Sequence, residues 1–277
     1  MTLWDRSFAL SPTDEEYKMT AQLLSTSEGR TLVLTLSNPE FRNALGPEIY
    51  ASGVEALSVA ESSPDVRSVV ITGANGIFSA GGNLQRLQNN RQLPPEHQAQ
   101  SIEGLHNWIE AIRTFPKPVI AAVEGPAAGA GFSLALACDM IVAARNSVFV
   151  MAYSSIALSP DGGGSWSLSR VVPRQLATEL LMCGERIGAD RLLQLGVVNR
   201  LADAGQSLQQ ALALCDLLNA RAPNALASIK ELLSDADNSS LNVQLAHERD
   251  HFVKNLHHTN AGIGISSFLN KQKPEYE

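Results

Sequence analysis

One aspartate stands between a proline and three consecutive glycines in the stretch ALSPDGGGSW, residues 157–166. An apolar run precedes this stretch and a helical pattern follows it. Pro-Asp-Gly is common in turns, and an aspartate just before a helix is a common N-cap. Consecutive glycines are less usual, because each costs about 1 kcal/mol inside a helix. The unusual feature is therefore a carboxylate, that of Asp161, beside a backbone without side chains.

Two further glycine-rich junctions share this arrangement, FSAGGNL at 78–84 and EGPAAGAGFSLA at 124–135. At each, a strand pattern leads into the start of a helix pattern. The first N–H groups of a helix have no partner inside the helix and point into open space. Such donors suit an anion or an oxyanion that develops during a reaction. The three junctions therefore indicate a site for an anion or an oxyanion.

A dinucleotide-binding loop is one explanation of these glycines. The segment GAGFSL, residues 129–134, has the first two glycines of G-x-G-x-x-G and lacks the third. The nearest acidic residue, Asp139, comes too soon to end the next strand, as that fold requires. No Walker A sequence is present. The match to a nucleotide-binding motif is weak.

A serine hydrolase is a second explanation, because GFSLA is similar to a nucleophile elbow without its last glycine. Ser133, Asp161 and His257 follow the Ser–Asp–His chain order of such enzymes. An elbow serine, however, sits at the turn from strand to helix. Here the strand is expected to end near Glu124, which places Ser133 inside the helix. Packing of a small residue between helix and sheet is the favoured role for Ser133.

The elements that must position these junctions alternate between buried strands and helices, which predicts an α/β fold. The C-terminal third is helical in pattern. We expect a loosely held extension at 1–18, an α/β core at 19–205 and a helical region at 206–277. Strands are expected at 30–38, 66–74, 117–125 and twice within 140–151; helices are expected at 43–62, from 84, at 101–115, at 131–139, after 161 and from 208 onward.

Composition limits the function classes. The chain has 277 residues, of which 44% are hydrophobic and 18% charged, as in a globular protein with a substantial core. A net charge of −7 argues against nucleic acid or an anionic membrane as the main partner. Charged residues and glycines interrupt the longest apolar runs, so no membrane span is expected.

The three cysteines, Cys138, Cys183 and Cys215, are far apart and odd in number. We expect them to be buried thiols in a reducing compartment. The first residues lack the pattern of a signal peptide. A cytoplasmic location is therefore expected.

Five motifs together resemble the enoyl-CoA hydratase/isomerase family, the crotonase superfamily, over about residues 20–277. They are NPEFRNAL (38–45), VVITGANGIFSAGGNL (69–84), KPVIAAVEGPAAGAGFSLALACDMIVAA (117–144), FVMAYSSIALSPDGGGSWSLSR (149–170) and GIGISSFLNKQKP (262–274). The resemblance implies a spiral of ββα units with a C-terminal helical region. It also implies an acyl-CoA thioester substrate whose enolate is held by two backbone N–H groups. Matched onto this chain, those donors belong to Gly82 and Ala130.

The resemblance further implies which residues contact coenzyme A and how the chain assembles. Arg42 would meet phosphate. Phe268 and Lys271 would reach the coenzyme A of the same or a neighbouring subunit, in a trimer or a dimer of trimers. The remaining implied contacts are Ala44, Ser79, Ala80 and Leu84.

The chain departs from the family's hydratases at two positions. Where hydratases carry two glutamates that handle water, this chain has Ser133 and Tyr153, neither of which is a carboxylate base. The carboxylate is instead at Asp161, a position that is similar to that of the ring isomerases of phenylacetate catabolism. The resemblance therefore implies an acyl-CoA isomerase with Asp161 as acid and base. We expect the glycines to clear space for the acyl chain, and Trp166, Phe149 and Met151 to make the pocket apolar.

Other functions remain as alternatives. On the same fold, Asp161 would activate water in a hydratase or a thioester hydrolase. A dehalogenase would need an aromatic cradle, and aromatics are only 5% of the chain. A non-catalytic, RNA-binding relative would need a basic surface, and no long Lys/Arg run is present.

No metal site is expected from the histidines. His247 and His251 are four residues apart on an expected helix and could bind a metal together, but no third ligand is evident. We therefore expect no metal and no cofactor other than the coenzyme A of the substrate.

Overall fold

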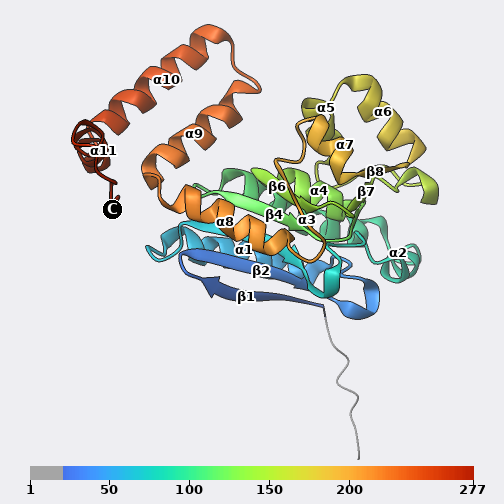
Figure 1. The fold of residues 1–277 in the computed structure, drawn as a ribbon. Coiled ribbons are helices and arrows are strands. Elements are labelled where there is room, and N and C mark those ends of the chain that lie inside the picture. Colours follow the sequence, from blue (N-terminus) through green and yellow to red (C-terminus); the bar gives the residue numbers. More distant parts are fainter. Residues whose placement is uncertain (1–20) are drawn as a thin grey trace, which may run out of the picture.

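Two sheets form the centre of the computed structural model, which describes residues 21–277 (Figure 1). Within that range, six strands form a sheet in the order β1-β2-β3-β4-β6-β9. β1 and β2 are antiparallel, and all other neighbours are parallel. The strands are β1 (Gln22–Glu28), β2 (Thr31–Ser37), β3 (Ser68–Gly73), β4 (Val119–Val123), β6 (Met140–Ala144) and β9 (Arg200–Ala202).

The larger sheet is covered on both faces, because its central strands are apolar at successive positions. Side chains of a strand alternate between faces. Val69 and Ile71 accordingly join the core cluster that contains Leu105 and Trp108, whereas Val70 joins a second cluster with Leu214. Helices α1 (Pro47–Ser62) and α3 (Pro95–Thr114) contribute to the first cluster, and α8 (Ser207–Asn219) contributes to the second.

The chain follows a spiral path because it passes between the larger sheet and a second, smaller sheet. In the described part of the chain it has three strands in the order β5-β7-β8, with β5 and β7 parallel. The strands are β5 (Pro126–Ala128), β7 (Val148–Val150) and β8 (Arg186–Gly188). Two stretches of the chain, β4-β5-α4 and β6-β7-α5, each add one strand to the larger sheet, one to the smaller sheet, and then a helix. These helices are α4 (Ala130–Ala137) and α5 (Gly164–Val171).

The remaining helices flank these sheets or project from them. They are α2 (Leu84–Asn90), α6 (Arg174–Cys183), α7 (Ala189–Gln194), α9 (Pro223–Ala236), α10 (Leu241–Leu256) and α11 (Thr259–Leu269), with short 3-10 turns η1 (Pro39–Phe41), η2 (Ala74–Gly76) and η3 (Ser154–Ile156). α9, α10 and α11 extend away from the sheets, whereas α8 packs on them (Figure 1). The region expected to be helical, 206–277, thus contains α8, which packs on the larger sheet, and the projecting helices from Pro223 onward. No helix between residues 21 and 277 is both long and apolar enough to cross a membrane.

The expected α/β fold with a helical C-terminal region is confirmed, as are the expected strands β2, β3, β4, β6 and β7. The expected continuous helix after Asp161 is divided, because Pro173 separates α5 from α6. Strands β1, β5, β8 and β9 were not expected from the sequence. The expected extension at 1–18 lies outside the described residues.

The expectation of three buried thiols is wrong for one cysteine. Cys138 and Cys215 are buried, but Cys183 is exposed. Cys183 ends α6, a helix that buries Ala177 and Leu180 and leaves its other face toward solvent. Cys183 and its neighbour Met182 therefore both lie on the exposed side of the helix, although the sequence around them is apolar.

Candidate active site

Strand pairing and a side-chain hydrogen bond bring the three glycine junctions together. Ser79 pairs with Ala127 in an isolated bridge, and Ala127 pairs with Phe149 within the smaller sheet. The Ser79 N–H donates to the Pro126 carbonyl at 3.1 Å, and the Ala128 N–H donates to the Ser79 carbonyl at 2.9 Å. The first two junctions lie at this pairing, whereas the third is separated from β7 by η3. The Ser133 hydroxyl, in the second junction, donates to the Asp161 carbonyl at 3.1 Å and so brings the third junction against the second.

The first two junctions touch backbone to backbone, and glycines allow this contact. Gly81 has φ of +87°, and a Cβ on it would lie 2.5 Å from the Ala128 carbonyl oxygen. A Cβ on Gly131 would lie 2.7 Å from the Cβ of Ser79. Both contacts are shorter than any side chain tolerates. These glycines therefore set how closely the loops approach.

Gly82 and Ala130 line the same cavity. Ala130 is the first residue of α4, where the helix offers its N–H no partner. Between residues 21 and 277, neither the Gly82 nor the Ala130 N–H donates to a backbone carbonyl outside regular helices and strands. The structure thus brings the two predicted donors together, as a site for a thioester oxygen requires.

The cavity that these amides line has a volume of ≈ 430 Å³. Residues of α2, of α3 and of the segment before α5 surround it. Most of its lining is apolar: Ala80, Leu84, Leu87, Ile102, Ala152, Ile156, Leu158 and Pro160. Its polar side chains are those of Gln98, His106, Tyr153, Ser155, Ser159 and Asp161. Of the described residues that line the cavity, only Asp161 carries a carboxylate.

Asp161 does not cap the helix that follows it. α5 begins at Gly164, and its N-cap is Gly163, which makes no capping side-chain hydrogen bond. The Asp161 carboxylate is half-buried and instead accepts a hydrogen bond from the Tyr153 hydroxyl at 2.6 Å. The side chain is therefore directed to the cavity rather than to the helix terminus.

Ser133 and Tyr153, which occupy the two hydratase glutamate positions, both contact Asp161. Ser133 lies inside α4, as expected, and its hydroxyl donates to the Asp161 carbonyl at 3.1 Å. The Ser133 and Tyr153 hydroxyl oxygens are 3.5 Å apart. The side chains at these two positions thus hold Asp161, and they do not provide the carboxylates that would position a water molecule.

The three glycines after Asp161 have a different role from the one expected. They do not line the cavity. Gly162 and Gly163 have φ of +57° and +73°, and a Cβ on Gly164 would lie 2.5 Å from the Ser133 Oγ. These glycines therefore allow a left-handed turn that packs tightly against α4. They position Asp161 and do not make room for an acyl chain.

The apolar lining also comes from other residues than expected. Phe149 is fully buried against Phe132, with ring centroids 5.0 Å apart, and Met151 is buried as well. Trp166 is 38% exposed, and the Arg170 guanidinium stacks on its ring at 3.9 Å. None of these three side chains lines the cavity.

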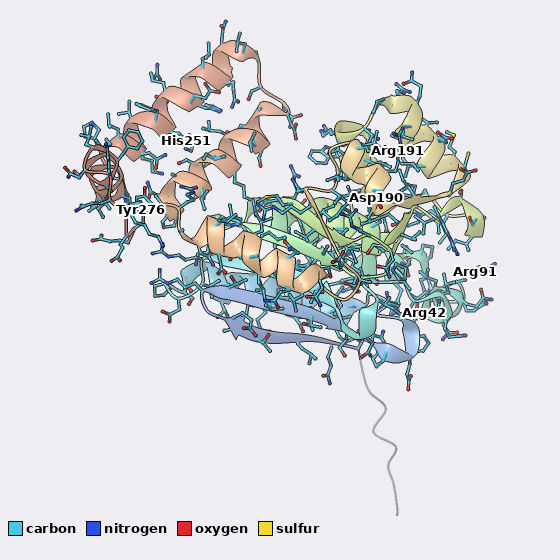
Figure 2. The ribbon with its side chains drawn as sticks, viewed as in Figure 1. Arg42, Arg91, Asp190, Arg191, His251 and Tyr276 are labelled. Atoms are coloured by element: carbon cyan, nitrogen blue, oxygen red, sulfur yellow. The ribbon has the colours of Figure 1, made fainter. Side chains whose placement is uncertain are left out.

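Some of the residues expected to contact coenzyme A lie at or near the cavity. Ala80 and Leu84 line it, and the Ala80 N–H donates to the Arg42 carbonyl at 3.0 Å. Arg42 itself is exposed and lies at the α2 end of the molecule, as Figure 2 shows. Among residues 21–277 the Arg42 guanidinium has no ion-pair partner.

Ala44 and Ser79 are buried and do not line the cavity. The Ser79 hydroxyl donates to the Asn43 carbonyl at 2.8 Å and accepts from the Gly81 N–H at 3.1 Å. Asn43 in turn donates its amide to the carbonyls of Ala74 and Ile77. These side chains therefore hold the loops in place.

Phe268 and Lys271 do not meet the cavity within one chain. Phe268 is 83% exposed on α11, and Lys271 follows that helix. α11 and α2 lie at opposite ends of the molecule in Figure 1. We expected Phe268 and Lys271 to contact the coenzyme A of the same or of a neighbouring subunit. In a single chain the two residues are too far from the cavity for the first arrangement.

The sequence did not identify the part of the cavity that α3 forms. Gln98, Ile102 and His106 line the cavity and are spaced four residues apart on that helix. Such spacing places side chains on one face. The spacing was visible in the sequence, but nothing there indicated that this face meets a cavity.

No group of three His, Cys, Asp or Glu side chains within residues 21–277 is arranged to hold a metal ion. His247 and His251 on α10 lie beside acidic groups of α9. His247 Nδ1 is 3.1 Å from Asp235, and His251 Nε2 is 3.7 Å from Glu231. The two histidines thus join neighbouring helices.

Comparison with known families agrees with this geometry. The family model "Enoyl-CoA hydratase/isomerase" matches residues 26–277, and the chain belongs to that family. The resemblance inferred from the five motifs is thereby confirmed. So is the expectation that the chain is an enzyme of this family.

Individual relatives carry different activities. The chain is 34% identical over 255 residues to 1,2-epoxyphenylacetyl-CoA isomerase of Escherichia coli (strain K12), covering 92% of this chain and 97% of that protein. It is 32% identical over 258 residues to 2,3-dehydroadipyl-CoA hydratase of the same strain, covering 93% and 99%. A crystal structure of an enoyl-CoA hydratase from Polaromonas sp. JS666 is 69% identical, with a TM-score of 0.91, covering 92% and 99%.

Proposed function

We propose that this chain is an acyl-CoA isomerase in which Asp161 moves a proton between carbon atoms of a CoA-bound enolate. The supporting observation is that the Asp161 carboxylate lines the same cavity as the Gly82 and Ala130 amides. A proton beside a thioester carbonyl is weakly acidic. A carboxylate removes it only where the oxyanion is stabilised as it forms, and one backbone donor is typically worth about 3–4 kcal/mol.

The reaction begins when Asp161 takes a proton from the carbon next to the thioester. The C–H electron pair moves onto the thioester oxygen, which the two amides stabilise. Return of the proton from Asp161 to a different carbon completes the isomerisation. The proposed chemistry needs no cofactor besides the coenzyme A of the substrate.

The hydroxyl side chains at 133 and 153 favour isomerisation over hydration. Hydration requires a group that positions and splits water, and Ser133 and Tyr153 are both bonded to Asp161. The similarity to 1,2-epoxyphenylacetyl-CoA isomerase supports the same choice and suggests a ring-containing acyl group. The mostly apolar lining of the cavity suits such a group.

Hydration by water that Asp161 activates is the second candidate. The 69% identity to a structure described as an enoyl-CoA hydratase favours it. The two candidates differ in the mass of the product, because hydration adds one water and isomerisation adds nothing.

A screen of acyl-CoA thioesters with products identified by mass tests the proposal. Straight-chain unsaturated thioesters are compared with aromatic-derived ones, and crotonyl-CoA serves as the hydratase reference substrate. We expect an isomer of unchanged mass from a ring-containing thioester, with negligible hydration of crotonyl-CoA. Crotonyl-CoA hydration at the rate of a dedicated hydratase would overturn the isomerase assignment.

We also propose how coenzyme A is held. Arg42 would bind a phosphate of coenzyme A, since the residue is exposed and its main-chain carbonyl is bonded to the Ala80 N–H at the cavity. Phe268 and Lys271 would contact the coenzyme A of a neighbouring subunit, in a trimer or a dimer of trimers.

We also propose a cytoplasmic location, which the three free and widely separated cysteine thiols support.

A further inference from the structure

Tyr153 stands beside Asp161 in the cavity, and the reaction proposed above does not use it. The side chain is 8% exposed, and its hydroxyl donates to Asp161 Oδ1 at 2.6 Å. Hydrogen bonds from a hydroxyl to a carboxylate are typically about 2.5–2.7 Å long and about twice as strong as neutral ones. This bond is therefore a strong restraint on the carboxylate.

The phenol keeps its proton beside the carboxylate. Burial, and then the negative charge of Asp161 and the hydrogen bond to it, raise the pKa of the Tyr153 hydroxyl above its usual range. The hydroxyl therefore remains a donor and does not become a competing base.

The main chain of Asp161 is held as well. Its carbonyl accepts hydrogen bonds from the Ser133 hydroxyl and the Gly164 N–H, both at 3.1 Å. Between residues 21 and 277, Tyr153 is the only residue whose side chain bonds the carboxylate. One carboxylate oxygen, Oδ2, is thus left for a proton.

Tyr153 also contacts the loop of the oxyanion site. A Cβ on Gly129 would lie 3.6 Å from the Tyr153 ring, and the Gly129 N–H is tied to the Val150 carbonyl at 2.8 Å. Gly129 directly precedes Ala130. Tyr153 is therefore close both to the carboxylate and to the residue that precedes a candidate oxyanion donor.

We propose that Tyr153 is a positioning residue for proton transfer, holding the Asp161 carboxylate so that Oδ2 faces the α-carbon of the bound thioester. This inference rests on the proposed role of Asp161. When the α-C–H bond breaks, its proton goes to Oδ2 and its electron pair to the thioester oxygen. The phenol proton stays on Tyr153.

Exchange of α-protons isolates this step without knowledge of the physiological substrate. The probe is phenylacetyl-CoA in D₂O, with deuterium incorporation followed by mass. Tyr153→Phe is expected to slow exchange by about 10- to 100-fold, the range for a lost hydrogen bond to a charged group. The dissociation constant of phenylacetyl-CoA should stay within about threefold, because the residue acts on the carboxylate and not on coenzyme A.

Tyr276→Phe is the matched control, because it removes a tyrosine hydroxyl on the C-terminal side of α11, away from the cavity (Figure 2). It should exchange at the wild-type rate. Melting temperatures of both variants show whether either has lost its fold. A lower melting temperature for Tyr153→Phe with wild-type exchange would assign Tyr153 a purely structural role and overturn the inference.

A double variant separates this inference from the proposed function. In the Asp161→Asn background, Tyr153→Phe should cause no further loss, because it acts through the carboxylate. Losses that multiply in the double variant would overturn the positioning role. If Tyr153→Phe exchanges α-protons at the wild-type rate while Asp161→Asn exchanges them far more slowly, only the inference is overturned. Exchange in Asp161→Asn near the wild-type rate, or none in the wild type, would overturn the proposed function itself.

Discussion

At the scale of single residues, the Asp161 side chain does not cap α5, although its position just before that helix suggests an N-cap. Gly163 is the N-cap of α5, and the Asp161 carboxylate is bonded to Tyr153. Loss of the carboxylate should therefore affect chemistry more than folding.

Asp161→Asn is expected to lower turnover by about 10²–10⁴-fold, the usual contribution of a positioned base. The acyl-CoA dissociation constant and the melting temperature should change little, because asparagine has nearly the same size and its oxygen still accepts from Tyr153. Turnover, calorimetric binding and thermal unfolding measure the three quantities on the substrate that the screen identifies.

Asp190→Asn is a matched control for this substitution. Asp190 is exposed and pairs with Arg145 at 3.2 Å on the surface, an interaction of small energetic value. It should turn over at the wild-type rate. A loss of only a few-fold in Asp161→Asn would be too small for a missing base and would exclude Asp161 as the acid/base.

The cysteines should differ sharply in reactivity. Burial raises the pKa of the Cys138 and Cys215 thiols, whereas Cys183 is exposed. Thiolate, not thiol, is the nucleophile toward disulfide reagents. We expect the folded protein to show one fast thiol, that of Cys183, and Cys183→Ser to remove it. Fast labelling of a second thiol in the folded protein would contradict the described packing of α4 or α8.

At the scale of elements, the contact between the first two glycine junctions can be tested at Gly131. Gly131→Ala places a Cβ 2.7 Å from the Cβ of Ser79, so the two loops must separate. We expect a loss of about 1–3 kcal/mol in the free energy of unfolding together with weaker catalysis. Chemical denaturation and turnover measure these effects.

Gly262→Ala is the control, because it is also a glycine in a helix. A Cβ there has nothing within 4 Å. Alanine should stabilise α11 by about 0.5–1 kcal/mol through its higher helix propensity. Equal stability changes in the two variants would show that Ser79 does not restrict the space at Gly131.

Long apolar elements were predictable from the sequence, and short ones were not. β3 and β4 are buried on both faces, so their apolar runs stand out. β5, β8 and β9 have three residues each, too few for a periodic pattern, and β7, equally short, was expected because it belongs to an apolar run within 140–151. β1 is an edge strand whose side chains are mostly exposed, so its sequence carries no apolar alternation.

The site was predictable where it depends on the main chain. The glycine-rich junctions indicated an oxyanion site, and the family resemblance then implied Gly82 and Ala130 as its donors, both of which line the cavity. The partnership of Tyr153 with Asp161 was not predictable, since a 3-10 turn and an irregular segment separate the two. The part of the cavity formed by α3 depends on tertiary packing that local patterns do not report.

At the scale of the whole molecule, the projecting helices expose an unusual number of apolar side chains. They are Ile229, Leu233, Leu241, Val243, Leu245, Phe252, Val253, Leu256, Ile265, Phe268 and Leu269. Apolar surface of this extent typically marks an interface. α9–α11 extend away from the sheets, so a second chain has access to it (Figure 1).

Sedimentation velocity at micromolar concentration should therefore give the mass of three or six chains. Phe252→Glu, on an exposed position of α10, should shift the protein toward smaller species by placing a charge in the interface. Glu248→Gln on the same helix, which removes a charge, should leave assembly intact. A wild-type monomer would refute the proposed assembly.

The contact between the first two glycine-rich junctions affects which parts of the candidate site can change by substitution during evolution. The two candidate oxyanion donors are peptide N–H groups, fixed by strand pairing between successive turns of the spiral. Substitution of an ordinary side chain leaves these groups in place. In the proposed function, the acid/base at 161 and its supports at 133 and 153 are side chains, which a single substitution changes directly. On this proposal the fold itself determines enolate stabilisation and the side chains determine the reaction type, in keeping with relatives named as an isomerase and as a hydratase at 34% and 32% identity.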